Sequence, residues 1–315
     1  MRLEDMRYFV EIVNAKSINQ ASKTLFVAQP ALSRTITSME RELGFSLLER
    51  SKHGIKTTKA GQEVYNDCVK ILQQYAACSR KWKDLSYQTM ENFSPVRVVA
   101  LPMICNVTMN DVFFEIAQQY PKIQLTLFER QLHDVLETTV EEPHSICFSH
   151  YNDQTKNDIY HFAREHHMQI IPLFDDEYKF FASSKNPLVG KPLTIDDLKD
   201  CTIASYSNRE TEENPKFIAA GLTGFTSNFK NAIFLSNRYT IVDLVIANKA
   251  INLFADIITL PESYRQNNSI QPLEVTDFHL PMTYFLMMSA EASLEESIVA
   301  DMLQKHYLAL AASTR

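Results

Sequence analysis

The segment SINQASKTL at residues 17–25 and, after a short break, QPALSRTITSMEREL at residues 29–43 decide the fold of the start of this chain. Ser17 with Gln20 three residues later is a capping-box pair, which begins a helix. Pro30 suits the first turn of a second helix, where its missing N–H costs nothing, and Gly44 suits its end. The apolar positions of the second helix recur every three or four residues: Leu32, Ile36, Met39 and Leu43. Two short helices joined by a turn are therefore predicted.

Polar side chains occupy the opposite face of the second predicted helix. They are Gln29, Ser33, Arg34 and Thr37. Side chains of these types hydrogen-bond to base edges and phosphates, so the pair is interpreted as a helix-turn-helix with a recognition helix. A buried stripe with polar residues opposite it is also typical of ordinary surface helices, so the spacing alone leaves a helix pair of another role open.

The first sixty residues resemble the winged helix-turn-helix of LysR-type transcriptional regulators. The matching segments are FVEIV (9–13), QPALS (29–33), MERELG (39–44), LLER (47–50) and TTKAG (57–61). Lys16 stands where a glycine usually precedes the serine, Ser22 replaces an alanine and Leu48 replaces a phenylalanine. None of these departures lies on the predicted reading face. The resemblance implies that this part of the chain binds double-stranded DNA.

A basic turn follows the predicted recognition helix. Arg50, Lys52 and His53 cluster beside Gly54, which permits a tight turn. A basic hairpin beside a recognition helix can enter the minor groove or bind phosphate, although an isolated charge run is usually a solvated one. The predicted DNA-binding residues are Ser17, Gln29, Pro30, Ser33, Arg34, Thr37, Arg50, Lys52 and His53.

The distribution of charge supports this prediction, although the net charge of the chain is −7. Residues 1–61 hold ten Lys and Arg against six Asp and Glu, which gives +4. Residues 62–93 hold four of each sign, so the rest of the chain carries −11. A basic N-terminal domain on an acidic body is what a local nucleic-acid-binding module requires.

Residues 61–91 are predicted to form one long linker helix. Its apolar positions alternate steps of four and three: Val64, Cys68, Ile71, Tyr75, Cys78, Trp82 and Leu85. This strict heptad pattern is typical of a seam between two helices. Since no other segment of the chain is expected to cover it, we predict that it pairs with a second copy of the chain. The resemblance implies a dimer at this helix, and a dimer of dimers in the full assembly.

Residues 94–315 alternate predicted strands and helices, which indicates an α/β fold. Strands are predicted at 96–101, 123–128, 146–149, 178–183, 192–198, 201–205 and 251–254, with helices near 108–119 and 237–248. The chain is divided into a winged helix-turn-helix domain at 1–60, the linker helix at 61–91 and an effector-binding domain at 94–315. Within the last, lobe one is predicted at 94–168 and 271–315 and lobe two at 169–270.

This body resembles the LysR effector domain, which is similar to periplasmic binding proteins, through QYPKIQL (119–125) and KPLTIDDL (191–198). NKAI (248–251) replaces a Gly-x-Gly of the family, and Met103 stands where many members have a Ser or Thr that binds an effector carboxylate. The effector residues implied by the register are Met103, Phe148, His150, Ser205 and Tyr206. Thioether sulfur favours an apolar or aromatic effector over a simple dicarboxylate.

Other chemistry finds less support in the sequence. Cys147 and His150 fall on opposite faces of a strand end, and no oxyanion motif accompanies them, so no enzyme activity is expected. No metal or cofactor is expected, because the histidines near 161–167 lack a second spaced pair of ligands. Five scattered cysteines fit a reducing compartment, and no apolar run approaches the roughly 20 residues of a membrane span. These features predict a cytoplasmic protein.

We therefore expect a sequence-specific transcriptional regulator controlled by a small-molecule effector bound between two lobes. Its expected partners are double-stranded DNA, further copies of itself and that effector, with contact to RNA polymerase as a further option. Two alternatives belong to other classes: a solute-binding protein with a fused helical head, and an enzyme of the cleft. A signal peptide would favour the first, and a catalytic dyad would favour the second.

Overall fold

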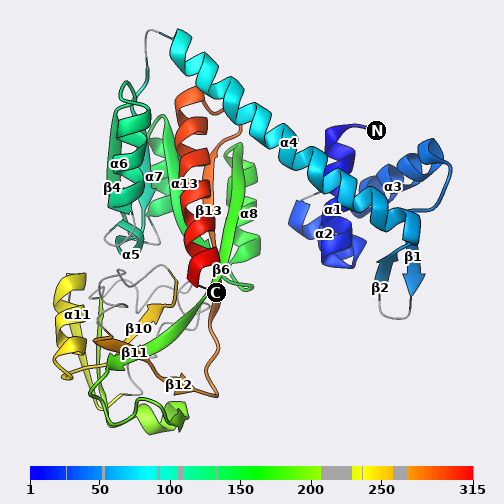
Figure 1. Cartoon of the computed structure of the whole chain (residues 1–315). Helices are drawn as coiled ribbons and strands as arrows, with labels where there is room; N and C mark the ends of the chain where they lie inside the picture. The colour runs from blue at the N-terminus through cyan, green and yellow to red at the C-terminus, as the bar shows by residue number, and fades with distance from the viewer. Residues whose placement is uncertain are drawn as a thin grey trace. The chain divides into compact units, whose positions relative to one another are not determined.

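The computed structural model divides the chain into two compact units, residues 1–89 and residues 90–315 (Figure 1). The structure describes residues 1–25, 27–51, 54–90, 93–105, 109–131, 134–206, 229–235, 237–257 and 268–314. None of the helices within these ranges combines the length and apolar character that crossing a membrane requires.

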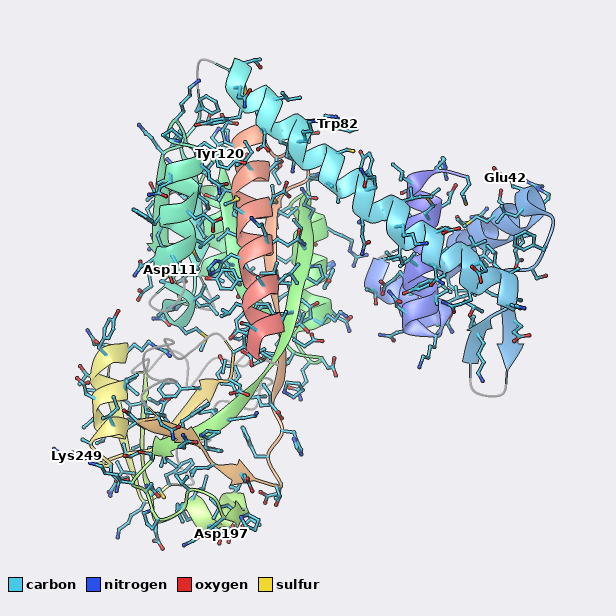
Figure 2. All side chains as sticks on the ribbon, viewed as in Figure 1. Glu42, Trp82, Asp111, Tyr120, Asp197 and Lys249 are labelled. Carbon is cyan, nitrogen blue, oxygen red and sulfur yellow. The ribbon has the colours of Figure 1, made fainter. Side chains whose placement is uncertain are left out.

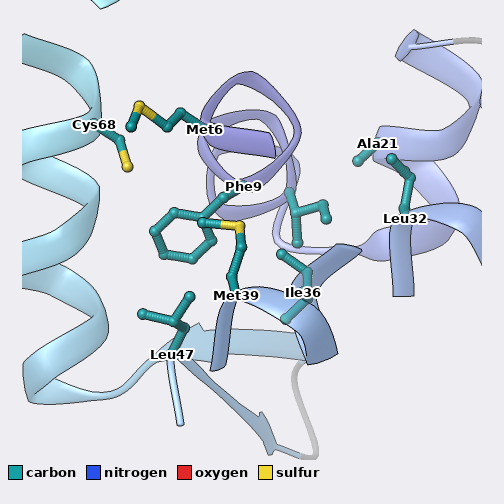
Figure 3. Packing of buried hydrophobic residues seen from close by; sticks show 9 residues of the cluster. Met6, Phe9, Ala21, Leu32, Ile36, Met39, Leu47 and Cys68 are labelled. Carbon is teal, nitrogen blue, oxygen red and sulfur yellow. The ribbon is translucent and has the colours of Figure 1, made fainter. Parts of the chain in front are cut away.

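Three helices form the core of the first unit: α1 (Leu3–Ala15), α2 (Ile18–Leu25) and α3 (Gln29–Leu43). Figure 3 shows the side chains that meet between them. The fully or almost fully buried ones are Met6, Phe9, Ile12, Ala21, Leu32, Ile36, Met39 and Leu47. The stripe predicted for α3 is confirmed at Leu32, Ile36 and Met39, whereas the sequence did not identify Ile12, which is 0% exposed.

Local signals set the helix ends. The amide of Gln20 donates to the Ser17 hydroxyl at 3.2 Å, which confirms Ser17 as the cap of α2. Gly44 ends α3 with a φ of +82°, and its amide donates to the Glu40 carbonyl. The amide of Gly61 donates to the Thr58 hydroxyl at 2.8 Å, so Thr58 caps the following helix.

The wing is a two-stranded hairpin of β1 (Leu48–Ser51) and β2 (Gly54–Thr57), paired antiparallel with Arg50 opposite Ile55. The amide of Ile55 donates to the Lys16 carbonyl at 3.0 Å, which ties the wing to the turn between α1 and α2. Gly54 approaches that turn so closely that a Cβ added to it would lie 2.8 Å from the Lys16 oxygen. Only glycine fits this approach.

Helix α4 (Lys59–Thr89) corrects part of the predicted seam. Cys68 is 1% exposed and packs in the core of residues 1–89 beside Met6 and Phe9, and Val64 packs against the same core (Figure 3). The expectation that this helix finds no cover within its own chain is wrong for these two residues. Cys68 is already buried and has no surface left to contribute to a dimer. The prediction was wrong here because heptad spacing shows that a stripe is covered but not which partner covers it.

The largest sheet of the second unit has the strand order β10-β6-β13-β5-β3-β4, with β10 formed by Asn252–Ala255. The strands of lobe one are β3 (Val96–Ala100), β4 (Leu125–Glu129), β5 (Ser145–Tyr151) and β13 (Pro281–Ser289). β3 is parallel to β4 and β5, while β13 runs antiparallel between β5 and β6 (Met168–Ser183). The helices of this lobe are α5 (Pro102–Cys105), α6 (Met109–Gln119), α7 (Val135–Glu141), α8 (Lys156–Glu165) and α13 (Leu294–Thr314).

Lobe two holds β8 (Thr202–Tyr206) parallel to β9 (Asn231–Leu235), and β10 (Asn252–Ala255) antiparallel to β6. Helix α11 (Arg238–Ile246) covers these strands through Ile241, Val242 and Val245, which pack against Phe181 and Phe254. The short strands are β7 (Pro192–Leu193), β11 (Ile270–Pro272) and β12 (Glu274–Val275). Residues 195–198, predicted as strand, instead form a 3₁₀ turn that begins with a capping box of Thr194 and Asp197.

The chain passes between the lobes later than predicted. Residues 168–177 of β6 pair with β13 in lobe one, and only from Tyr178 onward does β6 pair with β10. The return occurs after β12, since residues 270–275 still pair with lobe-two strands. The predicted bounds of 169 and 270 are wrong because one continuous strand serves both lobes, and no turn residue marks the passage.

Candidate nucleic-acid interface and effector region

The exposed face of α3 begins at its first residues. Pro30, Arg34 and Thr37 are exposed, and Gln29 and Ser33 are half-buried. The Gln29 amide Nε2 donates to the Ser33 hydroxyl at 2.9 Å, and the Thr37 hydroxyl donates to the Ser33 carbonyl at 3.0 Å. These short local bonds fix side chains in place before any partner arrives, which reduces the entropy lost on binding.

Arg34 has the geometry for a specific contact. Its Nε donates to the Pro30 carbonyl at 3.3 Å, which leaves the two Nη groups of the guanidinium for another acceptor. Arginine makes its commonest specific DNA contact through such paired N–H groups, with O6 and N7 of guanine. The buried stripe on the opposite side of α3 holds this face outward.

The wing supplies further basic residues. Lys56 and Lys59 are exposed, on β2 and at the start of α4. Arg50 lies in β1 opposite Ile55, but its side chain is not described, and Lys52 and His53 lie outside the described residues. The predicted backbone contacts of these three residues therefore stay predictions.

The second half of α4 carries a row of exposed apolar side chains. Exposed fractions are 43% for Ile71, 47% for Tyr75, 54% for Trp82 and 51% for Leu85, and Cys78 is half-buried. The rings of Tyr75 and Trp82 meet edge to face with centroids 6.2 Å apart (Figure 2 labels Trp82). Four large apolar groups aligned on one face are typical of a surface that a partner covers.

In the second unit, Met103 lies in α5 directly after β3, and two tyrosines reach its sulfur. The hydroxyl of Tyr178 donates to Met103 Sδ at 3.2 Å, and the hydroxyl of Tyr284 does so at 3.7 Å. Tyr178 also lies 3.4 Å from His150 Nε2. The structure thus joins the predicted residues Met103 and His150 through two tyrosines that the sequence did not identify, because they come from distant strands.

The buried histidine near Met103 is uncharged at pH 7. Burial lowers the pKa of His150 to about 4, so its imidazole carries no charge there. Burial is also the largest cause that raises the pKa of Tyr284 well above its usual value. His150 and the two tyrosine hydroxyls therefore supply no positive charge to an anionic ligand, although the charges of buried Asp176 and Arg238 both act on Tyr284.

Phe148 was predicted to bind effector, and that prediction is wrong. Its side chain is 0% exposed and packs edge to face against Tyr307 of α13, with ring centroids 4.6 Å apart. Phe148 lies in the middle of strand β5, which is buried on both faces, so its side chain is part of the core rather than of an open surface. Ser205 is half-buried in β8 opposite Phe234, and the side chain of Tyr206 is not described.

The fold defines the class of this protein. It is a winged helix-turn-helix protein with a sensor-like domain, because it combines a helix pair and a wing with a long helix and a two-lobed α/β body. Residues 3–62 match the family described as bacterial regulatory helix-turn-helix protein, lysR family, and residues 91–302 match the LysR substrate binding domain. These matches cover most of the sequence, and the chain belongs to the LysR family.

Individual relatives agree with this assignment. BenM of Acinetobacter baylyi, an HTH-type transcriptional regulator, is 44% identical over 72 residues, which are 23% of this chain and 24% of that protein. BudR of Raoultella terrigena, another such regulator, is 29% identical over 148 residues, 47% of this chain and 50% of that protein. The matched segments thus span half or less of these curated relatives.

A solved structure extends the likeness to the whole chain. CrgA of Neisseria meningitidis, a LysR-type transcriptional regulator, is 16% identical, with 98% of this chain and 99% of that one covered and a TM-score of 0.58. At this identity the likeness shows the fold.

Proposed function

We propose that this protein is a sequence-specific DNA-binding transcriptional regulator. The observation that carries the proposal is the exposed polar face of α3, with Gln29, Ser33 and Arg34 held opposite a buried apolar stripe. The family match supports it, because the N-terminal match is to a regulatory helix-turn-helix. A regulator that binds chromosomal DNA acts in the same compartment as the chromosome, so we propose that the protein is cytoplasmic.

Replacing Arg34 with alanine tests the recognition helix. Specific affinity for the operator is expected to fall by about 1–3 kcal/mol, and discrimination at one base pair should relax, because a bidentate donor is lost. Arg7→Ala removes an exposed arginine from α1 and serves as the matched control. Fluorescence anisotropy with operator and scrambled DNA measures both variants, and equal operator affinity for Arg34→Ala and wild type would refute this role of α3.

The assembly is proposed to be a dimer through the exposed row of α4, and a dimer of dimers in the full protein. This row consists of Ile71, Tyr75, Cys78, Trp82 and Leu85, and it leaves out Val64 and Cys68, which pack against the core of residues 1–89. The two helix-turn-helix domains of one dimer would each bind one half-site, so the expected operator is near-palindromic. Effector binding would change the angle between the paired helix-turn-helix domains and so transmit the signal to the DNA. Contact with RNA polymerase is a further part of the proposal.

The effector is proposed to be an apolar or aromatic compound that binds near Met103, His150 and Ser205, with Tyr206 beside it. The uncharged imidazole of His150 and the tyrosine hydroxyls that donate to the Met103 sulfur support this class over simple dicarboxylates. Aromatic compounds are expected to raise the melting temperature, because a ligand that binds only the folded state stabilises it.

Thermal-shift screening with both compound classes measures this effect, with Met103→Thr as the paired variant. The variant should lose part of the shift with aromatic compounds and gain one with dicarboxylates. A clear dicarboxylate shift in wild type that Met103→Thr does not strengthen would show that the effector is recognised elsewhere.

The enzyme alternative finds no support at Cys147. This side chain is 0% exposed, and burial raises the pKa of its thiol to about 12, so it is not a thiolate at pH 7. The relatives described above are transcriptional regulators rather than enzymes.

A further inference from the structure

The turn between α1 and α2 contains a lysine in an unusual backbone conformation. Lys16 has a φ of +51°, in the left-handed region that a residue with a Cβ adopts only at an energetic cost. Its amide donates to the Val13 carbonyl, which makes it the residue that terminates α1. Glycine is the usual residue at such a position, so a lysine here requires a reason.

The backbone around Lys16 is fixed from two sides. Its carbonyl accepts the Ile55 amide of the wing at 3.0 Å, and Gly54 packs directly against it. Ser17, the next residue, is held by its capping bond to the amide of Gln20. The side chain of Lys16 is therefore exposed but starts from a rigid turn, so its Cα is fixed in position between the helix and the wing.

An open pocket of about 420 Å³ lies at this turn. It is lined by residues 16–19, by Gln29 of α3 and by residues 54–55 of the wing. The lining contains a lysine, a serine, an asparagine and a glutamine, and none of its seven residues is acidic. Gln29 is shared with the reading face of α3, so the pocket is continuous with the proposed DNA interface.

We propose that this pocket binds a phosphate of the DNA backbone and that Lys16 is its cation. The inference rests on the proposed function and adds a positioning contact to it: phosphate contacts set the register of a protein on DNA, and base contacts then select the sequence. The pocket is large enough for a phosphate with its deoxyribose, and the side-chain amide of Asn19 is a donor of the right kind for phosphate oxygens.

A purely local role for Lys16 is the competing explanation. A cation at the end of α1 is favoured by the helix dipole whether or not DNA is present. The two roles differ in their consequences, because a dipole interaction changes thermal stability alone, whereas a phosphate contact changes the dependence of DNA binding on salt.

Lys16→Asn separates them, since asparagine tolerates the left-handed conformation but carries no charge. Loss of one phosphate contact in each of the two DNA-binding domains of a dimer should reduce the steepness of the slope of log K against log salt by about 1.8 and reduce affinity about 60-fold at 0.1 M salt. The loss should be equal for operator and scrambled DNA. Lys16→Arg should retain binding, and Lys70→Gln, which removes an exposed lysine of α4, should leave the slope unchanged.

Anisotropy titrations over 0.05–0.3 M salt, a range of about six-fold, give the slopes, and thermal melting reports folding of each variant. An unchanged slope and affinity for folded Lys16→Asn, with wild type still binding its operator, would overturn the phosphate site and leave the proposed function intact. Absence of operator binding by wild type itself would overturn the proposed function instead.

Discussion

Replacing Trp82 with glutamate is expected to turn the assembled protein into single chains that bind DNA weakly. Trp82 is 54% exposed in the single chain and is the fourth of the five residues of the apolar row on α4, in contact with Tyr75. A carboxylate at that place would lose its water when two helices pair, at a cost of several kcal/mol that the other side chains of the row do not offset. The fold of each chain should survive, because the residue is not part of its core.

Loss of the dimer should also reduce operator affinity. Two linked heads bind adjacent half-sites with a high effective concentration, so separation should cost roughly 10²–10⁴-fold in affinity. Gln73→Glu introduces the same charge at an exposed position on the opposite face of α4 and should leave the dimer intact. Sedimentation velocity measures both, and an intact dimer of Trp82→Glu would mean that the row does not form the interface.

Gly61→Ala is expected to disrupt the first unit, although alanine is the better helix former. A Cβ at residue 61 would lie far inside van der Waals contact with the carbonyl oxygen of Leu47. That oxygen already accepts the amide of Thr58 at 3.0 Å, so neither backbone segment can move away without loss of the bond. The expected destabilisation is about 3 kcal/mol or more, which exceeds the usual cost of core overpacking.

Helix propensity alone predicts the opposite sign for this substitution, a gain of up to about 1 kcal/mol. Urea unfolding followed by DNA-binding measurements decides between the two. Loss of the transition of residues 1–89, with that of residues 90–315 retained, is the expected result. A variant that is as stable as wild type would show that α4 and the residue before β1 are less tightly packed than described.

Signals local to the chain predicted most of the first unit. Ser17, Pro30 and Gly44 each mark a helix end through chemistry that operates within a few residues, and the structure confirms these ends. The same patterns did not reveal that Cys68 packs in the core of its own unit, because a stripe on a helix shows that something covers it and not what does.

Contacts between distant segments account for what the sequence did not reveal in the second unit. Tyr178 and Tyr284 meet Met103 only because β6 and β13 lie side by side in the sheet. Phe148 was misplaced for the same reason, since the helix that buries it begins at Leu294. Lys16 carries a local signal, since it is a lysine directly after a helix where glycine is usual.

Selection from random DNA by the full-length protein tests the central claim most directly. If α3 reads bases from a dimer, repeated binding and amplification should enrich one sequence with two related half-sites about one helical turn apart, or a multiple of that. Arg34→Ala should enrich the same sequence with one position in each half-site relaxed. Recovery of no preferred sequence by the wild-type protein, with and without candidate effectors, would contradict the account.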